Sequence, residues 1–277
     1  MRYKKGMLFC EISPTTYKIS VQKGIIQRHI KNFFSKEKPA KEHVEEKLPF
    51  LVSQSSSNLI KRAKGIDITL QENKAVNIDI ASKKINKIVI HPGEEFSFWR
   101  TVGKTSKKNG FLEGRVIEGN VLKPGVGGGL CNLGNTIHLL VLHSPLTVTE
   151  VHHHSDALAP ETGPRVPFSS GTSISYNYID FKFKNNTDQD FQLCVWCEDE
   201  KLFGELRSER EPECEYSIEE ENHRFVKEGE KFYRRSMIYR VEKDKATGEI
   251  VDKKLIRDNR SEVMYDYDLI PQDMIVM

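Results

Sequence analysis

No stretch of this 277-residue chain stays apolar for long enough to cross a bilayer. The longest apolar run lies around residues 139–142, whereas a membrane-spanning helix needs about 20 such residues. The basic N-terminus is followed by Glu11 and not by the apolar core of a secretory signal. Hydrophobic residues still make up 38% of the chain, enough for a globular core. We therefore expect a folded protein that is cytoplasmic, or one that has lost its leader.

A strong excess of one charge is missing as well. The formal net charge is +2, which does not favour nucleic acid as a partner. The charges are unevenly placed, however. Residues 1–41 hold ten Lys or Arg and two Glu, whereas residues 198–222 hold eleven acids and three bases. These charged flanks could attract each other or a partner protein, although such runs are usually solvated surface.

Cysteine is scarce and follows no disulfide rhythm. The five cysteines (10, 131, 194, 197 and 214) are an odd number, so at least one thiol is expected to be free. The glycine-rich run also lacks the Lys-Ser/Thr pair of a phosphate loop and the dinucleotide-binding fingerprint. No nucleotide or other cofactor is therefore expected.

The pattern of the chain predicts three parts. Residues 1–48 form a basic segment with an amphipathic helix over 17–35 and a linker or exposed helix over 35–48. Residues 49–214 form the main domain, and residues 215–277 form a C-terminal β-hairpin extension. The main domain is expected to contain a short helix at 59–63, a helix from 131 to about 143, and strands at 87–91, 147–154, 173–184 and 190–197.

Glycine is concentrated around one cysteine. Nine of the 18 glycines fall between residues 103 and 134, and Gly127, Gly128 and Gly129 precede Leu130 and Cys131. The helix predicted after them would place Cys131 at a helix N-terminus, where free N–H groups lower a thiol pKa and can bind an oxyanion. Cys131 is therefore a candidate nucleophile, weighed evenly against an inert buried thiol. The fold expected is α+β, with a glycine-rich loop and a helix carrying this cysteine packed on a mainly antiparallel sheet.

A nucleophilic cysteine needs a base, and five of the nine histidines lie within 23 residues downstream of Cys131. His154 is the candidate base and Asp180 the candidate orienting acid, although a simple charge at a sheet rim is the favoured interpretation of Asp180. His152 and His154, with Glu150 beside them, also suggest a metal-dependent hydrolase. No third ligand stands at a recognisable spacing, so no metal is included in the leading hypothesis.

Four segments together resemble the VanW family: 91–98, 127–131, 154–155 and 180–185. Residues 142–150 resemble in particular the members found in B-type vancomycin-resistance clusters. The likeness covers roughly 76–207, and the triple glycine before Cys131 is its most specific part. Asn132 stands where the family usually has Gln.

The resemblance implies a part in antibiotic resistance and cell-wall metabolism. Some VanW domains are regarded as L,D-transpeptidases that form a thioester with peptidoglycan peptides. Cys131 would then be the nucleophile, with Gly127, Gly128, Gly129 and Asn132 in the substrate site. The alternative is a non-catalytic module that binds peptidoglycan precursors or other resistance proteins through a groove at the glycines.

Overall fold

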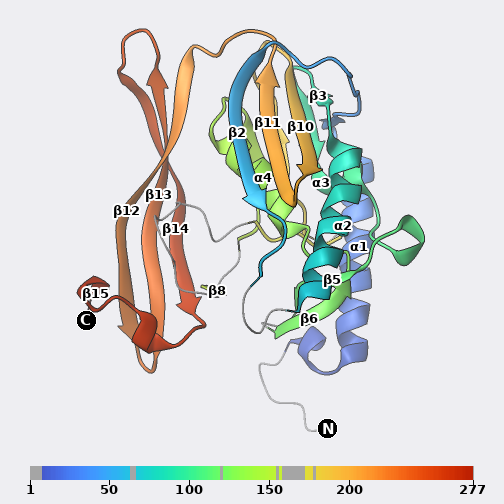
Figure 1. Cartoon of the computed structure of the whole chain (residues 1–277), viewed down its shortest axis with the longest axis vertical. Helices are drawn as coiled ribbons and strands as arrows, with labels where there is room; N and C mark the ends of the chain where they lie inside the picture. Colours follow the sequence, from blue (N-terminus) through green and yellow to red (C-terminus); the bar gives the residue numbers. More distant parts are fainter. Residues whose placement is uncertain are drawn as a thin grey trace.

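The computed structural model describes residues 8–62, 67–118, 121–153, 156–157, 172–176 and 179–276 (Figure 1). Within these residues lie the helices α1 (Pro14–Phe34), α2 (Ile68–Ile85), α3 (Phe98–Val102) and α4 (Cys131–Leu142). Short 3₁₀ turns form η1 (Phe9–Glu11), η2 (Lys107–Asn109), η3 (Tyr267–Leu269) and η4 (Gln272–Met274). The strands form separate, mostly antiparallel sheets, which confirms the expected α+β class. No helix of the described residues is long and apolar enough to span a membrane.

The first sheet is antiparallel throughout, with the order β2-β11-β10-β3. Its strands are β2 (Phe50–Asn58), β11 (Lys201–Ser208), β10 (Phe191–Glu198) and β3 (Ile88–Ile90). Both α2 and α4 contact this sheet. Gly204 of β11 allows α4 to come close, because a Cβ there would lie 2.9 Å from Cδ1 of Leu140. Side chains of both helices and the sheet form one core, which includes Ile78, Ile85, Leu133, Ile137 and Leu193.

The second sheet has the order β1-β4-β9-β7 and adjoins the first through the turn between β3 and β4. Its strands are β1 (Lys38–Pro39), β4 (Glu94–Ser97), β9 (Lys182–Lys184) and β7 (Thr147–Glu150). Phe96 and Phe183 stack between β4 and β9 with ring centroids 4.9 Å apart, and both rings are fully buried. These rings extend the main core under the second sheet.

Residues 38–48, expected to be a linker, lie against both sheets instead. β1 pairs in parallel with β4, and Ala40 N donates to Glu95 O at 3.0 Å. The buried Gln192 of β10 binds the irregular backbone that follows, because its Nε2 donates to Val44 O and its Oε1 accepts from Leu48 N. These partners lie far away in the sequence, so composition alone could not reveal them.

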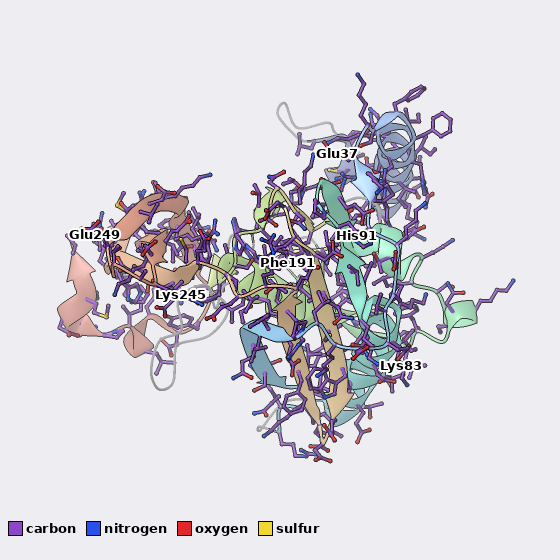
Figure 2. The ribbon with its side chains drawn as sticks, turned by 90° about the horizontal axis from the view of Figure 1, so that it is seen from above. Glu37, Lys83, His91, Phe191, Lys245 and Glu249 are labelled. Carbon is purple, nitrogen blue, oxygen red and sulfur yellow. The ribbon has the colours of Figure 1, made fainter. Side chains whose placement is uncertain are left out.

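The C-terminal residues form a sheet of their own with the order β15-β12-β13-β14-β8. Its strands are β15 (Ile275–Val276), β12 (Cys214–Glu228), β13 (Lys231–Asp244), β14 (Ile250–Val263) and β8 (Asp156–Ala157). The expected hairpin is the β13–β14 pair, and β12 is an additional long strand. A second small core of Phe225, Val263 and Ile270 stabilises this sheet. Figure 2 shows Lys245 and Glu249 on one side of the molecule and Glu37, just after α1, on another.

Two expected elements are wrong. Residues 59–62 are not helical, since they follow β2 with Leu59 buried and its N–H donating to Glu200 O at 2.8 Å. Of the strand expected at 173–184, only β9 is a regular strand within the described residues. The glycine-rich stretch is more regular than expected, because β5 (Glu113–Glu118) and β6 (Val121–Val126) pair as a hairpin before Gly127.

Candidate functional site

Cys131 is the first residue of α4, as the sequence predicts, and it follows a turn of glycines after β6. Gly127 and Gly129 have φ of +79° and +98°, conformations that side chains rarely adopt. Leu130 occupies the N-cap position and has no polar side chain to cap the helix. The first turn of α4 is therefore positioned by the packing of the glycine turn and not by a capping side chain.

The glycine turn is packed tightly against the rest of the chain. A Cβ on Gly128 would lie 2.3 Å from the carbonyl carbon of Gly114, and one on Gly129 would lie 2.0 Å from Cγ of Lys74. The buried Asn77 of α2 holds the turn, because its Nδ2 donates to Gly128 O at 2.9 Å and its Oδ1 accepts from Leu112 N at 2.7 Å. Packing within the chain therefore explains these glycines, and their predicted role in binding substrate stays a prediction.

Asn132, the other predicted substrate residue, points toward β2. Its Oδ1 accepts a hydrogen bond from Ser57 Oγ at 3.3 Å. This bond ties the start of α4 to the edge strand of the first sheet. A substrate contact by the Asn132 amide stays a prediction.

The Cys131 thiol faces the short segment Thr172–Tyr176. Its Sγ donates to Ile174 O at 3.8 Å, and its side chain packs against the main core. Burial raises the pKa of the Cys131 thiol above its ordinary value. The depressed pKa expected from the helix N-terminus is therefore not found, because the loss of solvation outweighs the helix dipole.

Two further side chains of α4 bind the same segment and were missed by the sequence analysis. Asn135 Oδ1 accepts from Thr172 N, and His138 Nδ1 lies 2.9 Å from Thr172 Oγ1. Cys131, Asn135 and His138 are four and three residues apart, so they share one face of the helix. This spacing is visible in the sequence and is the signal that could have found them.

The segment is held from its other side too, because Ser173 N donates to His152 O at 2.6 Å. His138 is buried, and burial together with the nearby His153 and Arg257 lowers its pKa to about 3. The imidazole is therefore neutral at physiological pH. Cys131 and His138 are separated by two helical turns, about 10 Å along the axis, so the geometry does not pair them directly.

His154, the predicted base, lies outside the described residues. His152 is described, and its Nε2 lies 3.1 Å from Glu150 Oε1. The described residues contain no group of three metal-ligating side chains near one another. The metal hypothesis therefore has no support from the part of the chain that is described.

Asp180, the predicted orienting acid, is completely buried. Its carboxylate accepts from Ser97 Oγ at 2.6 Å and from the backbone N–H groups of Trp99 and Phe181 at 3.1 and 2.9 Å. Burial raises the pKa of Asp180, against the lowering effect of these hydrogen bonds. The contacts with Ser97 and Trp99 hold the start of α3, which is a structural role. Contact with His154 stays a prediction.

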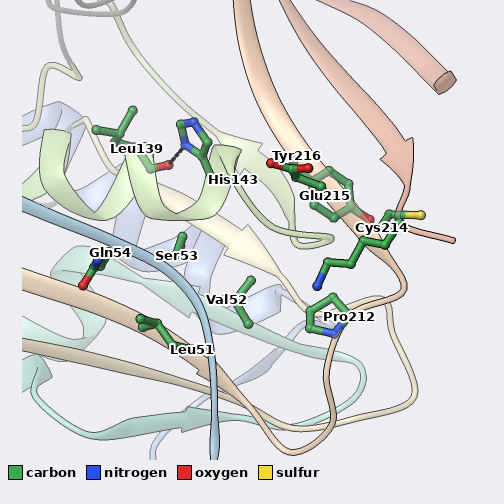
Figure 3. A pocket seen from close by; sticks show the side chains of 11 residues that line it. Leu51, Val52, Ser53, Gln54, Leu139, His143, Pro212, Cys214, Glu215 and Tyr216 are labelled. Atoms are coloured by element: carbon green, nitrogen blue, oxygen red, sulfur yellow. Dashed lines mark hydrogen bonds between the residues drawn. The ribbon is translucent and has the colours of Figure 1, made fainter. Parts of the chain in front are cut away.

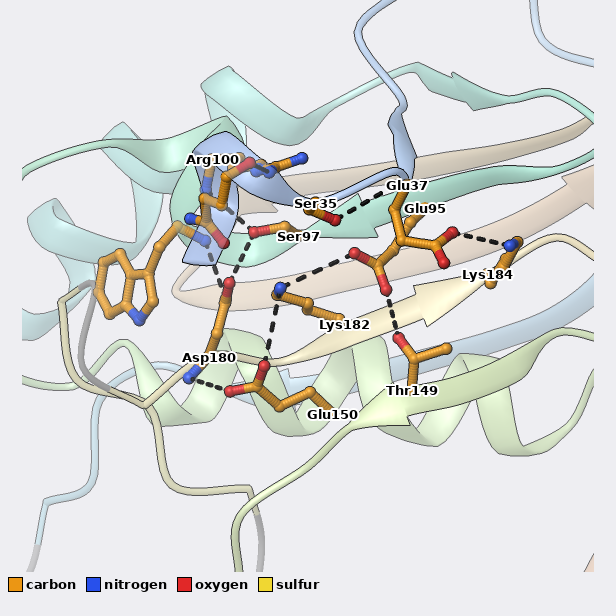
Figure 4. Close-up of polar contacts among 12 residues, drawn as sticks. Ser35, Glu37, Glu95, Ser97, Arg100, Thr149, Glu150, Asp180, Lys182 and Lys184 are labelled. Atoms are coloured by element: carbon orange, nitrogen blue, oxygen red, sulfur yellow. Dashed lines mark hydrogen bonds and ion pairs between the residues drawn. The ribbon is translucent and has the colours of Figure 1, made fainter. Parts of the chain in front are cut away.

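Next to Asp180, Lys182 lies between Glu95 and Glu150 (Figure 4), and Arg28 completes a balanced cluster of four charges. Lys182 Nζ lies 3.8 Å from Glu95 Oε2 and 3.7 Å from Glu150 Oε2. Arg28 of α1 donates to the two oxygens of the Glu150 carboxylate from Nη1 and Nη2. Burial alone would raise the pKa of Glu150, but Arg28, His152 and Lys182 lower it to about 2. Because the charges pair with one another, we assign the cluster to the docking of α1.

A cleft of about 290 Å³ lies at the other end of α4 (Figure 3). Leu51, Ser53, His143, Cys214 and Tyr216 line it, so it lies between β2, the end of α4 and the start of β12. His143 is turned back onto its own helix, because its Nδ1 lies 2.9 Å from Leu139 O. Leu139, the lining residue of α4 nearest to Cys131, is eight residues from it, about 12 Å along the helix axis.

Together, the fold and the site define an α+β protein with a partly buried thiol at the start of a helix that follows a closely packed glycine turn. The VanW like protein family model matches residues 73–207, which include this turn and Asp180. The chain is 32% identical over 221 residues to the vancomycin B-type resistance protein VanW of Enterococcus faecalis, covering 80% of each chain. The chain therefore belongs to the VanW family.

A second relative is more distant. The chain is 29% identical over 118 residues to the uncharacterized protein YoaR of Bacillus subtilis, which is 43% of this chain and 37% of that protein. No solved structure matches the chain.

Proposed function

We propose that this protein is a cysteine acyl-transfer enzyme of the L,D-transpeptidase kind that acts on the stem peptides of peptidoglycan, with Cys131 as the nucleophile. One contact carries the proposal: the thiol of Cys131 lies 3.8 Å from the main-chain carbonyl oxygen of Ile174. A peptide carbonyl group therefore fits beside the Cys131 thiol at the start of α4. Membership of the VanW family supports the cell-wall context, since its named relative is a vancomycin-resistance protein.

In the proposed reaction, Cys131 first loses its proton to a base and then attacks a carbonyl carbon of the stem peptide. The amide bond breaks, the leaving D-amino acid takes a proton from the protonated base, and a thioester remains on Cys131. An acceptor amine then attacks the thioester, loses a proton to the base and restores the thiol. N–H groups at the start of α4 would stabilise the oxyanion in both steps.

The raised pKa of Cys131 makes a base necessary, because little thiolate is present at neutral pH. His154 is the proposed base. Asp180 is the proposed orienting acid for this base, and its carboxylate also holds the start of α3 through Ser97 and Trp99.

The segment Thr172–Tyr176 occupies the face of α4 that an acyl donor would need. It is held by hydrogen bonds to Asn135, His138 and the backbone of His152, and Ile174 also packs in the main core. We propose that the substrate replaces Ile174 O at the thiol by displacing this segment. An expected cytoplasmic location would make precursors the substrates, and not the finished cell wall.

The test is release of the terminal D-amino acid from a synthetic stem tetrapeptide. Cys131→Ala should reduce turnover by at least about 10³-fold, because the covalent route is lost. Cys197→Ala is the matched control, since Cys197 is a partly buried thiol on β10. Full activity in a folded Cys131→Ala variant would refute the proposal.

The second candidate is a non-catalytic module that binds peptidoglycan precursors. The raised pKa of Cys131 favours it, because an inert thiol needs no base. This function predicts saturable binding of a D-Ala-D-lactate-ended precursor in calorimetry, unchanged by Cys131→Ser. Turnover that depends on Cys131 would rule it out as the complete function.

A further inference from the structure

α1 carries its large apolar side chains on the face that points away from the protein. Ile19, Ile26, Ile30 and Phe33 are 53%, 58%, 54% and 83% exposed. They are seven, four and three residues apart, so they form one stripe along the helix. Phe34 beside the stripe is 76% exposed. None of the residues of α1 is buried.

The opposite face of α1 attaches to the protein through polar contacts. Arg28 Nη1 donates to Glu150 Oε2 at 2.6 Å, and Asn32 O accepts from Arg100 Nη2 at 2.7 Å. Just beyond the helix, Lys184 Nζ donates to Glu37 Oε2 at 2.7 Å. A helix that packs on its own domain normally turns its apolar stripe inward. In α1 the partly buried Val21 and Ile25 lie on the side of Arg28, but the longer apolar stripe faces outward.

The charge of α1 is of one sign. Residues 14–34 contain no Asp or Glu, and the exposed Lys18, Lys23 and Lys31 flank the apolar stripe. An anionic bilayer has negatively charged headgroups over an apolar interior. Lysines beside an exposed apolar stripe are complementary to such a surface.

We propose that α1 is an interfacial helix, which binds the protein to anionic phospholipid membranes by inserting Ile19, Ile26, Ile30 and Phe33 between the headgroups. A second copy of the chain fits less well, because pairing two α1 stripes would bring lysines against lysines. The acidic strand β12 of another copy fits poorly too, since its exposed residues Glu215, Ser217, Glu219 and Glu221 offer no apolar side chain. This proposal does not depend on the proposed reactivity of Cys131.

The test is co-sedimentation of the full chain with vesicles of phosphatidylcholine alone and of phosphatidylcholine with about one third phosphatidylglycerol. The protein should bind the anionic vesicles and lose binding as salt rises. The triple variant Ile26→Ser, Ile30→Ser and Phe33→Ser should bind at least about 100-fold more weakly. Lys18→Gln with Lys23→Gln and Lys31→Gln should weaken binding by about 100-fold and remove its salt dependence.

The matched control is Ile250→Ser with Val251→Ser on β14, where both side chains are 61% exposed. This variant should bind vesicles like the unchanged protein, and circular dichroism should show the helix content of every variant intact. Absence of binding to anionic vesicles at low salt, or equal binding by the Ile26, Ile30 and Phe33 variant, would overturn the proposal. A dimer in light scattering that this variant abolishes would assign the stripe to a second copy and overturn it too.

Discussion

Burial controls the chemistry of the titratable side chains on α4. Cys131 stays protonated to higher pH and His138 stays neutral to lower pH than either would in water, because each lies among apolar neighbours. Both residues also bind the segment 172–176. A reactive Cys131 therefore requires a change at this segment that restores solvent or brings a base to the thiol.

His138 should make the stability of the protein depend on pH. Its pKa is about 3 in the fold and 6.5 ordinarily, so between these values the unfolded chain binds a proton that the folded chain does not. Stability is therefore lost as pH falls below 6.5, by up to about 1.4 kcal/mol per pH unit. Urea unfolding of His138→Asn between pH 7 and 5 should show this dependence reduced.

His29→Asn is the matched control, because His29 is an exposed histidine of α1. It should keep the pH dependence of the unchanged protein. If His138→Asn kept that dependence as well, the imidazole of His138 would not be buried in its neutral form.

The position of a single residue was predicted correctly where the signal comes from its neighbours in the sequence. The place of Cys131 at the start of a helix follows from the glycines before it and the apolar spacing after it. Its pKa was predicted in the wrong direction, because the burial depends on contacts such as Ile174, 43 residues further along the chain. Asp180 was predicted within a strand but precedes β9, because its carboxylate binds Ser97 and Trp99, which lie more than 80 residues earlier in the chain.

At the scale of elements, the glycine turn shows how α4 is held. Gly128→Ala should destabilise the fold by about 3 kcal/mol or more, since its Cβ would overlap the backbone of Gly114 and neither backbone can give way. Thermal unfolding of the variant should show a lowered Tm. Cys131 in this variant should also be alkylated faster, because the start of α4 is disturbed.

Gly134→Ala in α4 provides the control. A Cβ there would meet Cδ1 of Ile174 at 3.4 Å, and alanine stabilises a helix relative to glycine by about 1 kcal/mol. Its Tm should stay the same or rise. Equal Tm values for the Gly128 and Gly134 variants would contradict the close packing of the turn.

Elements with a regular apolar pattern were predicted well. The helices at 17–35 and 131–143 and the strands at 87–91 and 190–197 are α1, α4, β3 and β10, with small shifts at their ends. Residues 38–48 and 59–62 were predicted wrongly, because distant groups such as Gln192 and Glu200 O satisfy their backbone. The pattern of a short segment carries no information about such partners.

At the scale of the whole molecule, one arginine joins the C-terminal sheet to the end of α4. Arg240 of β13 donates from Nε to Leu142 O at 3.2 Å and from Nη2 to Ser144 O. Its guanidinium also lies over the Tyr216 ring, 4.4 Å from the centroid. Arg240 thus binds free carbonyls at a helix C-terminus, where a positive charge is favourable.

Arg240→Ala should weaken the contact between the two cores by about 2 kcal/mol, since bonds from a charged donor are lost. Calorimetry should then resolve the C-terminal sheet as an earlier transition, separate from the main core. Arg260→Ala is the control, because Arg260 lies on β14 and binds Glu228 within the same sheet. A single unshifted transition for Arg240→Ala would contradict this role.

The most direct test of the proposed function is a search for the thioester itself. The protein is incubated with a synthetic stem tetrapeptide, quenched in acid and mapped by peptide mass spectrometry, with Cys131→Ala treated in the same way. We predict an acyl adduct on the peptide that contains Cys131, with loss of one D-amino acid from the donor, and none in the variant. Turnover of the tetrapeptide without an adduct on Cys131, or with an adduct on another cysteine, would contradict Cys131 as the nucleophile.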